Sequence, residues 1–95
     1  MIQSFADGIT EAFFTHGTCP AQWRSFASVA RRKLDMLDAA VRLENLRSPP
    51  GNRLEALRGD RRGQWSIRSN DQWHVCFRWT AKGPADVEIV DYHRG

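Results

Sequence analysis

Apolar and polar side chains alternate in the heptapeptide Trp73-His74-Val75-Cys76-Phe77-Arg78-Trp79. Successive side chains of a β-strand point to opposite faces of a sheet, so this period of two predicts a strand with one apolar face. Large apolar side chains belong in the interior. We therefore expect Trp73 and Phe77 to lie in the core, with His74 and Arg78 on the opposite side of the sheet.

Shorter segments on both sides extend this strand into a sheet. Trp65 and Ile67 alternate with polar neighbours, which predicts a second strand. The dipeptide Asn-Asp at 70–71 tolerates positive φ and predicts a tight hairpin turn between the two strands. After another turn at 82–85, a last strand is predicted over 87–91. The second half of the chain therefore predicts an antiparallel meander.

The first half of the chain has helical periodicity instead. Asp7 suits an N-cap and Gly17 suits a left-handed C-terminal residue, which together predict a helix over 8–16. Pro20 suits the first position of a second helix, predicted over 20–42. An apolar stripe at steps of three and four defines this helix: Trp23, Phe26, Ala27, Ala30, Leu34, Leu37 and Val41.

Three further segments complete the pattern. Residues 1–5 predict a short opening strand, and Leu43 with Leu46 extends the second helix by one more turn. The segment RSPPGN at 47–52 is a loop, because two prolines exclude both a helix and a central strand. The elements predict an α+β fold with two N-terminal helices packed on an antiparallel sheet. A chain of 95 residues has room for one domain, which we expect to span 1–95.

Positive charge is concentrated in the second half of the chain. The net charge is +3; residues 1–46 hold five basic and five acidic groups, whereas residues 47–95 hold nine and six. A basic surface attracts phosphate backbones, although many solvent-exposed surfaces are equally basic. We interpret this basic surface as a candidate RNA-binding face. Its residues come from the loop region and from the polar side of the sheet: Arg53, Arg58, Arg61, Arg62, His74 and Arg78.

Several functional classes lack their sequence patterns. Cys19 and Cys76 are isolated and the three histidines lack metal-ligand spacing, so we expect no metal site. Nucleotide-binding, zinc-protease and hydrolase motifs are also missing, and we expect no cofactor. The N-terminus has neither the charge nor the apolar run of a signal peptide, and no stretch suits a membrane span. We therefore expect a cytoplasmic protein.

The C-terminal tripeptide Asp91-Tyr92-His93 combines three ionisable side chains at the end of a predicted strand. RNA carries its own nucleophile, the 2′-OH, and its cleavage needs a base, a proton donor and cations for the developing charge. The tripeptide and Arg68 can supply such groups without a metal ion. An ordinary chain terminus with no catalytic role accounts equally well for the same residues.

Three segments resemble the HigB branch of the RelE/ParE toxin superfamily: RLEALRGDRRGQWSIR at 53–68, NDQWHVCF at 70–77 and EIVDYH at 88–93. The opening MIQSF and the loop RSPPGNRL at 47–54 are similar to GraT-like members in particular. Each motif is weak alone, but together they are specific. The resemblance spans nearly the whole chain, with the same order of helices before strands. The resemblance implies two N-terminal helices packed on a curved antiparallel sheet.

The resemblance also implies a function. It predicts a ribosome-dependent endoribonuclease that cleaves translated mRNA in the A site, and a HigA-type antitoxin with a helix-turn-helix domain. Operator DNA would be bound only through the antitoxin complex. By position, His93 corresponds to the base or acid, Tyr92 orients or stacks on the substrate, and Asp91 positions its neighbours.

Two departures from the family pattern concern the same site. Several relatives have a histidine where this chain has Glu55, and many have an arginine where it has His74. Glu55 is therefore a rival for the role of base, while His74 is only partly protonated at neutral pH. Two other functions stay open: a ParE-like toxin that inhibits a protein such as DNA gyrase, and a binding subunit that acts only as a co-repressor.

Overall fold

The computed structural model describes residues 1–92, with helices before strands as predicted. The two α-helices are α1 (Gly8–His16) and α2 (Ala27–Ala39). The four strands are β1 (Glu55–Ala56), β2 (Trp65–Arg68), β3 (Trp73–Thr80) and β4 (Gly83–Asp91). Short 3₁₀ turns connect them: η1 (Ala21–Phe26), η2 (Leu43–Arg47), η3 (Pro50–Asn52) and η4 (Gly59–Arg61). In this part of the chain, no helix has the length and apolar character needed to cross a membrane.

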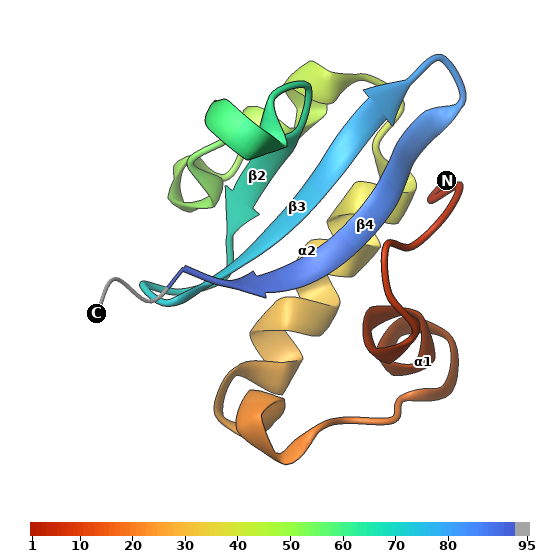
Figure 1. The fold of residues 1–95 in the computed structure, drawn as a ribbon, viewed down its shortest axis with the longest axis vertical. Coiled ribbons are helices and arrows are strands. Elements are labelled where there is room, and N and C mark those ends of the chain that lie inside the picture. Colours follow the sequence, from red (N-terminus) through yellow and green to blue (C-terminus); the bar gives the residue numbers. More distant parts are fainter. Residues whose placement is uncertain (93–95) are drawn as a thin grey trace.

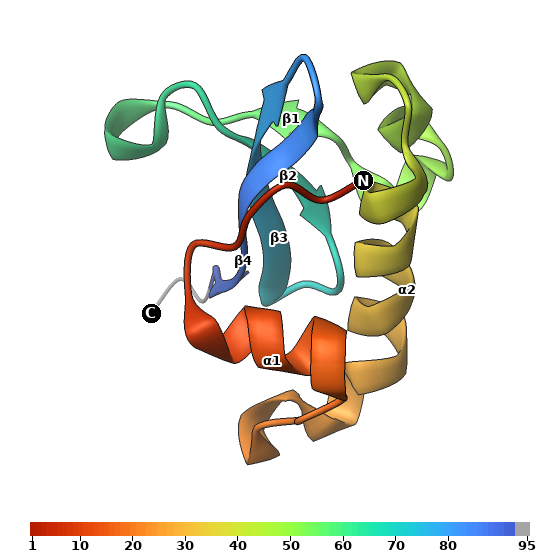
Figure 2. The same ribbon diagram turned by 90° about the vertical axis from the view of Figure 1, so that its right-hand side faces the viewer.

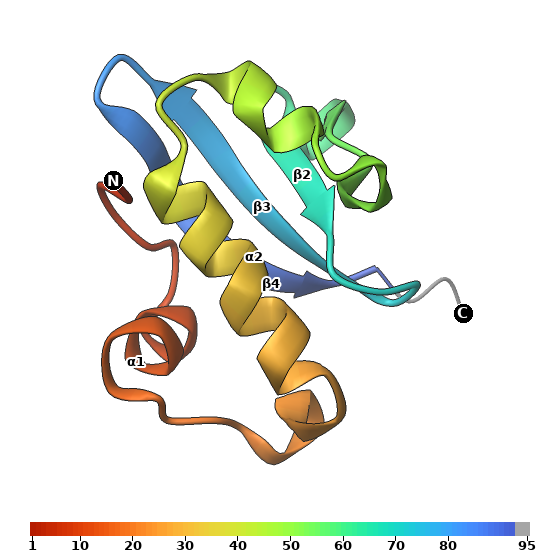
Figure 3. The ribbon, with the colours of Figure 1, turned by 180° about the vertical axis from the view of Figure 1, so that it is seen from behind.

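The strands form one sheet in the order β1-β2-β3-β4, and every neighbouring pair is antiparallel. Helix α2 runs across one face of this twisted sheet, behind β3 and β4, whereas α1 lies beside the outer edge of β4 (Figure 1). Seen from behind, α2 lies in front of the strands (Figure 3). The connection from β1 to β2 projects to the side away from α2 (Figure 2). The predicted α+β architecture is confirmed.

The capping residues place α1 where the sequence predicts it. The Asp7 carboxylate accepts a hydrogen bond of 2.7 Å from the backbone N–H of Thr10, which satisfies a donor left free by the first turn. Gly17 ends the helix at φ 74°, a left-handed conformation that glycine adopts without strain.

The second predicted helix is shorter than expected, because its ends have other conformations. Residues 21–26 form the 3₁₀ turn η1, whose i, i+3 repeat directs both Trp23 and Phe26 into the core. Phe26 leaves the helical region at φ −127° and ψ 15°, and α2 begins after it. At the other end the backbone of Ala40 is extended, so that Val41, predicted on the apolar stripe, is 84% exposed.

The N-terminal segment lies along the outer edge of β4, but it forms only a single parallel bridge, Phe5 to Val87, rather than the predicted strand. Val87 donates to the carbonyl of Ser4 and accepts from the N–H of Ala6. Asp86 has a φ of 51°, which interrupts the extended backbone that a longer ladder needs. The opening residues are therefore docked on the sheet without being a regular part of it.

The two faces of β2 and β3 separate as the alternation predicts. Ile67, Val75 and Phe77 are fully buried on the helix side, and the Trp73 ring stacks on Phe26 with 5.1 Å between centroids. The opposite face is not simply a solvent-exposed surface, because Cys76 is completely buried there. The polar side of the sheet is thus covered in part by other segments of the chain.

We expect Phe77→Ala to lower the free energy of unfolding by about 3–5 kcal/mol, because it removes a fully buried ring from the core. Val41→Ala is the matched control, since this exposed side chain should change stability by no more than about 0.5 kcal/mol. Urea unfolding followed by tryptophan fluorescence measures both values. An unaltered unfolding midpoint for Phe77→Ala would show that the faces of β3 are assigned wrongly.

Candidate functional site

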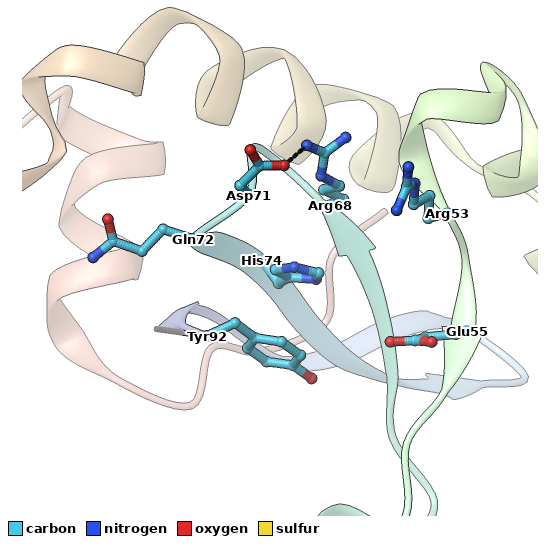
Figure 4. A pocket seen from close by; sticks show the side chains of 7 residues that line it. All are labelled: Arg53, Glu55, Arg68, Asp71, Gln72, His74 and Tyr92. Atoms are coloured by element: carbon cyan, nitrogen blue, oxygen red, sulfur yellow. Dashed lines mark hydrogen bonds and ion pairs between the residues drawn. The ribbon is translucent and has the colours of Figure 1, made fainter. Parts of the chain in front are cut away.

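A cleft of about 470 Å³ opens on the side of the sheet opposite α2, and its lining side chains are drawn in Figure 4. Its walls come from β1, β2, the β2–β3 turn, β3 and the residue after β4. The residues that line it are Arg53, Glu55, Arg68, Asp71, Gln72, His74 and Tyr92. Strand pairing explains the grouping, because Arg68 is opposite His74 and Glu55 is opposite Ser66 in the sheet register.

The cleft collects five of the residues singled out from the sequence: Arg53, Glu55, Arg68, His74 and Tyr92. Arg58 and Arg61 line a second hollow of about 640 Å³, which shares Glu55 and Tyr92 with the cleft.

Other predicted residues lie elsewhere. Arg62 and Arg78 lie outside both hollows as residues 1–92 form them. Asp91 is exposed at the end of β4, where its carboxylate accepts from Gln72 at 3.2 Å. His93 lies outside the described residues.

Two lining residues were not identified as site residues from the sequence. The sequence predicts only a turn at Asp71 and no role for Gln72, yet both side chains line the cleft. One feature of the sequence does point to Asp71. It follows Arg68 by three residues across the predicted hairpin turn, and in the structure the two side chains form an ion pair. The side chain of Asp71 is 97% exposed, whereas that of Arg68 is 27% exposed.

The aromatic ring of Tyr92 stacks on the His74 imidazole, with 4.0 Å between centroids and 14° between planes. The backbone N–H of Tyr92 donates to the carbonyl of Gln72, which ties the end of the described chain to the β2–β3 hairpin. The phenol oxygen lies 3.9 Å from the Cys76 sulfur. Burial, with a further contribution from Cys76, raises the pKa of Tyr92 to about 12, so the phenol is a neutral donor at physiological pH.

Burial also lowers the pKa of His74 below its ordinary value. The positive charge of Arg68 acts in the same direction, while the Glu55 carboxylate opposes both. The sequence predicts partial protonation of this histidine at neutral pH, and its position in the cleft moves the equilibrium further toward the uncharged form. His74 therefore differs from the arginines around it in carrying little charge at pH 7.

Ion pairs divide the arginines of the predicted RNA-binding surface into two groups. Arg61 is bonded to Glu88 at 2.7 Å, and Arg78 lies 3.4 Å from Asp86, so the charge of each is largely balanced. Arg53, Arg58 and Arg62 have no ion-pair partner within residues 1–92. Of the predicted basic surface, these three retain the most charge for an anionic ligand.

The η3 loop presents Arg53 to the cleft. Buried Asn52 donates to the carbonyl of Leu46 at 3.1 Å and accepts from the Lys33 ammonium at 2.6 Å. Arg53 follows in a left-handed conformation, with φ 46°.

Across the described residues, no group of three His, Cys, Asp or Glu side chains is arranged to hold a metal ion. The cleft thus combines two arginines, two carboxylates and two largely uncharged rings, those of His74 and Tyr92.

Comparisons with known proteins agree with this architecture. Residues 3–93 match the family described as the RelE-like toxin of the type II toxin–antitoxin system HigB. Toxin HigB-1 of Vibrio cholerae is 40% identical over 98 residues, covering 99% of each chain. An uncharacterised protein of Haemophilus influenzae is 35% identical over 78 residues, covering 81% of this chain and 77% of its own.

A solved structure shares the fold at lower sequence identity. It is the YoeB/ParE toxin from Agrobacterium tumefaciens, with a TM-score of 0.52, 18% identity and coverage of 98% of both chains. This likeness concerns the arrangement of helices and strands, whereas the matches in sequence define the family. The chain therefore belongs to the HigB-like toxins, the RelE-like toxins of type II toxin–antitoxin systems.

Proposed function

We propose that this toxin is a ribosome-dependent endoribonuclease that cleaves translated mRNA in the A site. The observation that carries the proposal is the grouping of Arg53, Arg68, Glu55, His74 and Tyr92 in one cleft. Phosphoryl transfer within RNA needs little covalent chemistry from a protein, but it does need positioning and charge stabilisation. A cleft that combines arginines with carboxylates offers both.

In the proposed reaction the 2′-oxygen attacks the adjacent phosphorus, and the bond from phosphorus to the 5′-oxygen breaks. A base removes the proton of the 2′-OH, and an acid returns a proton to the departing 5′-oxygen. The products are a 2′,3′-cyclic phosphate and a free 5′-hydroxyl. Arg68 and Arg53 are assigned to the phosphate, where their charge stabilises the additional negative charge of the transition state.

Two residues compete for the main proton transfer. His93 directly follows Tyr92 and has a reference pKa of about 6.5, close to working pH. Glu55 is the rival base, because its carboxylate lines the cleft together with His74 and Tyr92. Tyr92 is assigned to stacking or proton donation, in keeping with its raised pKa. Asp91 is assigned to positioning its neighbours.

Membership of the family implies an antitoxin partner. We propose that this partner is a HigA-type protein with a helix-turn-helix domain, that both act in the cytoplasm, and that operator DNA is bound only through their complex.

Expression of the toxin with and without this antitoxin, followed by mapping of mRNA 5′ ends, tests the proposed nuclease activity. New ends within open reading frames that depend on translation support it. Growth arrest without new ends favours an inhibitor of a protein target.

We expect Arg58→Ala to weaken ribosome binding and to flatten its dependence on salt. Each phosphate neutralised by a side chain contributes about 0.9 to the slope of log K against log salt on a duplex, and about 0.7 on a single strand. Arg61→Ala should flatten the slope less, because Arg61 is already bonded to Glu88. Exposed Arg24, on η1, supplies the control substitution Arg24→Ala. An unchanged slope for folded Arg58→Ala would remove Arg58 from the RNA surface.

We expect His93→Gln to lower single-turnover cleavage on translating ribosomes by about 10²–10⁴-fold, as for loss of a general acid or base. Glu55→Gln should have a smaller effect if Glu55 only supports the site. Circular dichroism and antitoxin binding check that each variant is folded. Wild-type cleavage by His93→Gln together with loss in Glu55→Gln would transfer the main role to Glu55. Full toxicity of both variants would contradict the nuclease proposal.

A further inference from the structure

His74 lies at the centre of the cleft, between Arg68 and the ring of Tyr92 (Figure 4). Its backbone is held on both sides, opposite Arg68 in β2 and opposite Val90 in β4. Its ring is fixed by the stack on Tyr92, at 4.0 Å and 14°. A side chain that is restrained in this way presents its ring nitrogens in constant directions.

The two ring nitrogens of His74 are in different environments. Nδ1 is buried and has no hydrogen-bond partner within residues 1–92. A buried N–H without an acceptor is less well tolerated than a buried lone pair without a donor. A neutral imidazole has one N–H, and the buried Nδ1 is the unfavourable place for it. The geometry therefore favours the tautomer that carries its proton on Nε2.

The same argument applies to the charged form. An imidazolium carries N–H groups on both nitrogens, so protonation would place an unpaired donor at the buried Nδ1. The charged groups that line the cleft around this ring are Arg53 and Arg68, which disfavour a positive charge, and Glu55 and Asp71, which favour it. Asp71 is already bonded to Arg68, which leaves Glu55 as the main opposing carboxylate. Burial lowers the pKa of His74 despite Glu55.

We propose that His74 is a fixed, uncharged hydrogen-bond donor, whose Nε2–H binds a non-bridging phosphate oxygen of the RNA and is retained throughout cleavage. This role rests on the proposed nuclease function. With this role for His74, three kinds of group in the site have separate functions. Arginines supply charge, His93 or Glu55 transfers protons, and His74 orients the phosphate by a directed bond that the stack on Tyr92 keeps in place.

The protonation state of His74 can be observed without any cleavage assay. Long-range ¹H–¹⁵N correlation spectra of histidine-labelled toxin distinguish the two neutral tautomers and the imidazolium, and the spectrum of His74→Gln assigns the signal. We expect the Nε2–H tautomer at pH 7, both free and with saturating RNA oligonucleotide in which 2′-methoxy groups replace the 2′-hydroxyls. The oligonucleotide should shift the Nε2–H proton downfield. An Nδ1–H tautomer, an imidazolium in the bound state, or no shift at saturation would overturn the proposal.

Kinetics on translating ribosomes give the second test. His74→Phe keeps a ring for the stack but lacks a donor, and should lower single-turnover cleavage by about 10²-fold, as for loss of one positioned donor. His74→Gln keeps a neutral N–H and should lose less activity than His74→Phe. The pH–rate profile of His74→Gln should keep the shape of the wild-type profile. Disappearance of the acid limb in this variant would show that His74 titrates during the reaction, and would overturn the proposal.

The two tests separate this proposal from the nuclease assignment. If the wild-type toxin cleaves no RNA, the proposed function fails, yet the spectra still report whether the cleft holds a neutral donor that binds phosphate. If cleavage occurs and the spectra show a bound imidazolium, only the role of His74 fails.

Discussion

Burial of Val75 and Phe77 beneath α2 is the contact on which the rest of the molecule depends. Because side chains alternate along a strand, placing these two in the core fixes His74 and Cys76 on the opposite face. A shift of one residue in the pairing would exchange the two faces entirely. The position of His74 in the cleft is therefore a consequence of core packing, and a mutation in the core can abolish activity without touching any group in the cleft.

The sequence predicted well those features that local patterns determine. The Asp7 cap and Gly17 placed α1 correctly, and alternation assigned the faces of β3. The break of the second helix at Phe26 was missed, because the apolar stripe continues through it and only the backbone geometry changes. The cleft was predicted only in part. Asp71 joins it through an ion pair across a turn, and turn residues carry no periodic signal.

Net charge is a poor description of this site. Of the basic residues predicted for RNA binding, Arg61 and Arg78 are balanced by Glu88 and Asp86 on the neighbouring strand β4. The cleft itself is mixed, with two arginines, two carboxylates and two rings that carry little charge at pH 7. Binding to such a surface depends on the geometry of the contacts as much as on electrostatic attraction. This surface suits the proposed RNA substrate, whose phosphate and base must both be oriented before cleavage.

The docking of the N-terminal segment also affects the edges of the sheet. An exposed edge strand has unpaired N–H and C=O groups that can pair with another chain. On β4 several of these groups are already used: the N–H of Val87 donates to the carbonyl of Ser4, and that of Ile89 donates to the hydroxyl of Thr10 in α1. At the other edge, β1 has only two residues. Strand addition by a second copy at β4 would first have to displace the opening residues, so the fold resists edge-to-edge aggregation there.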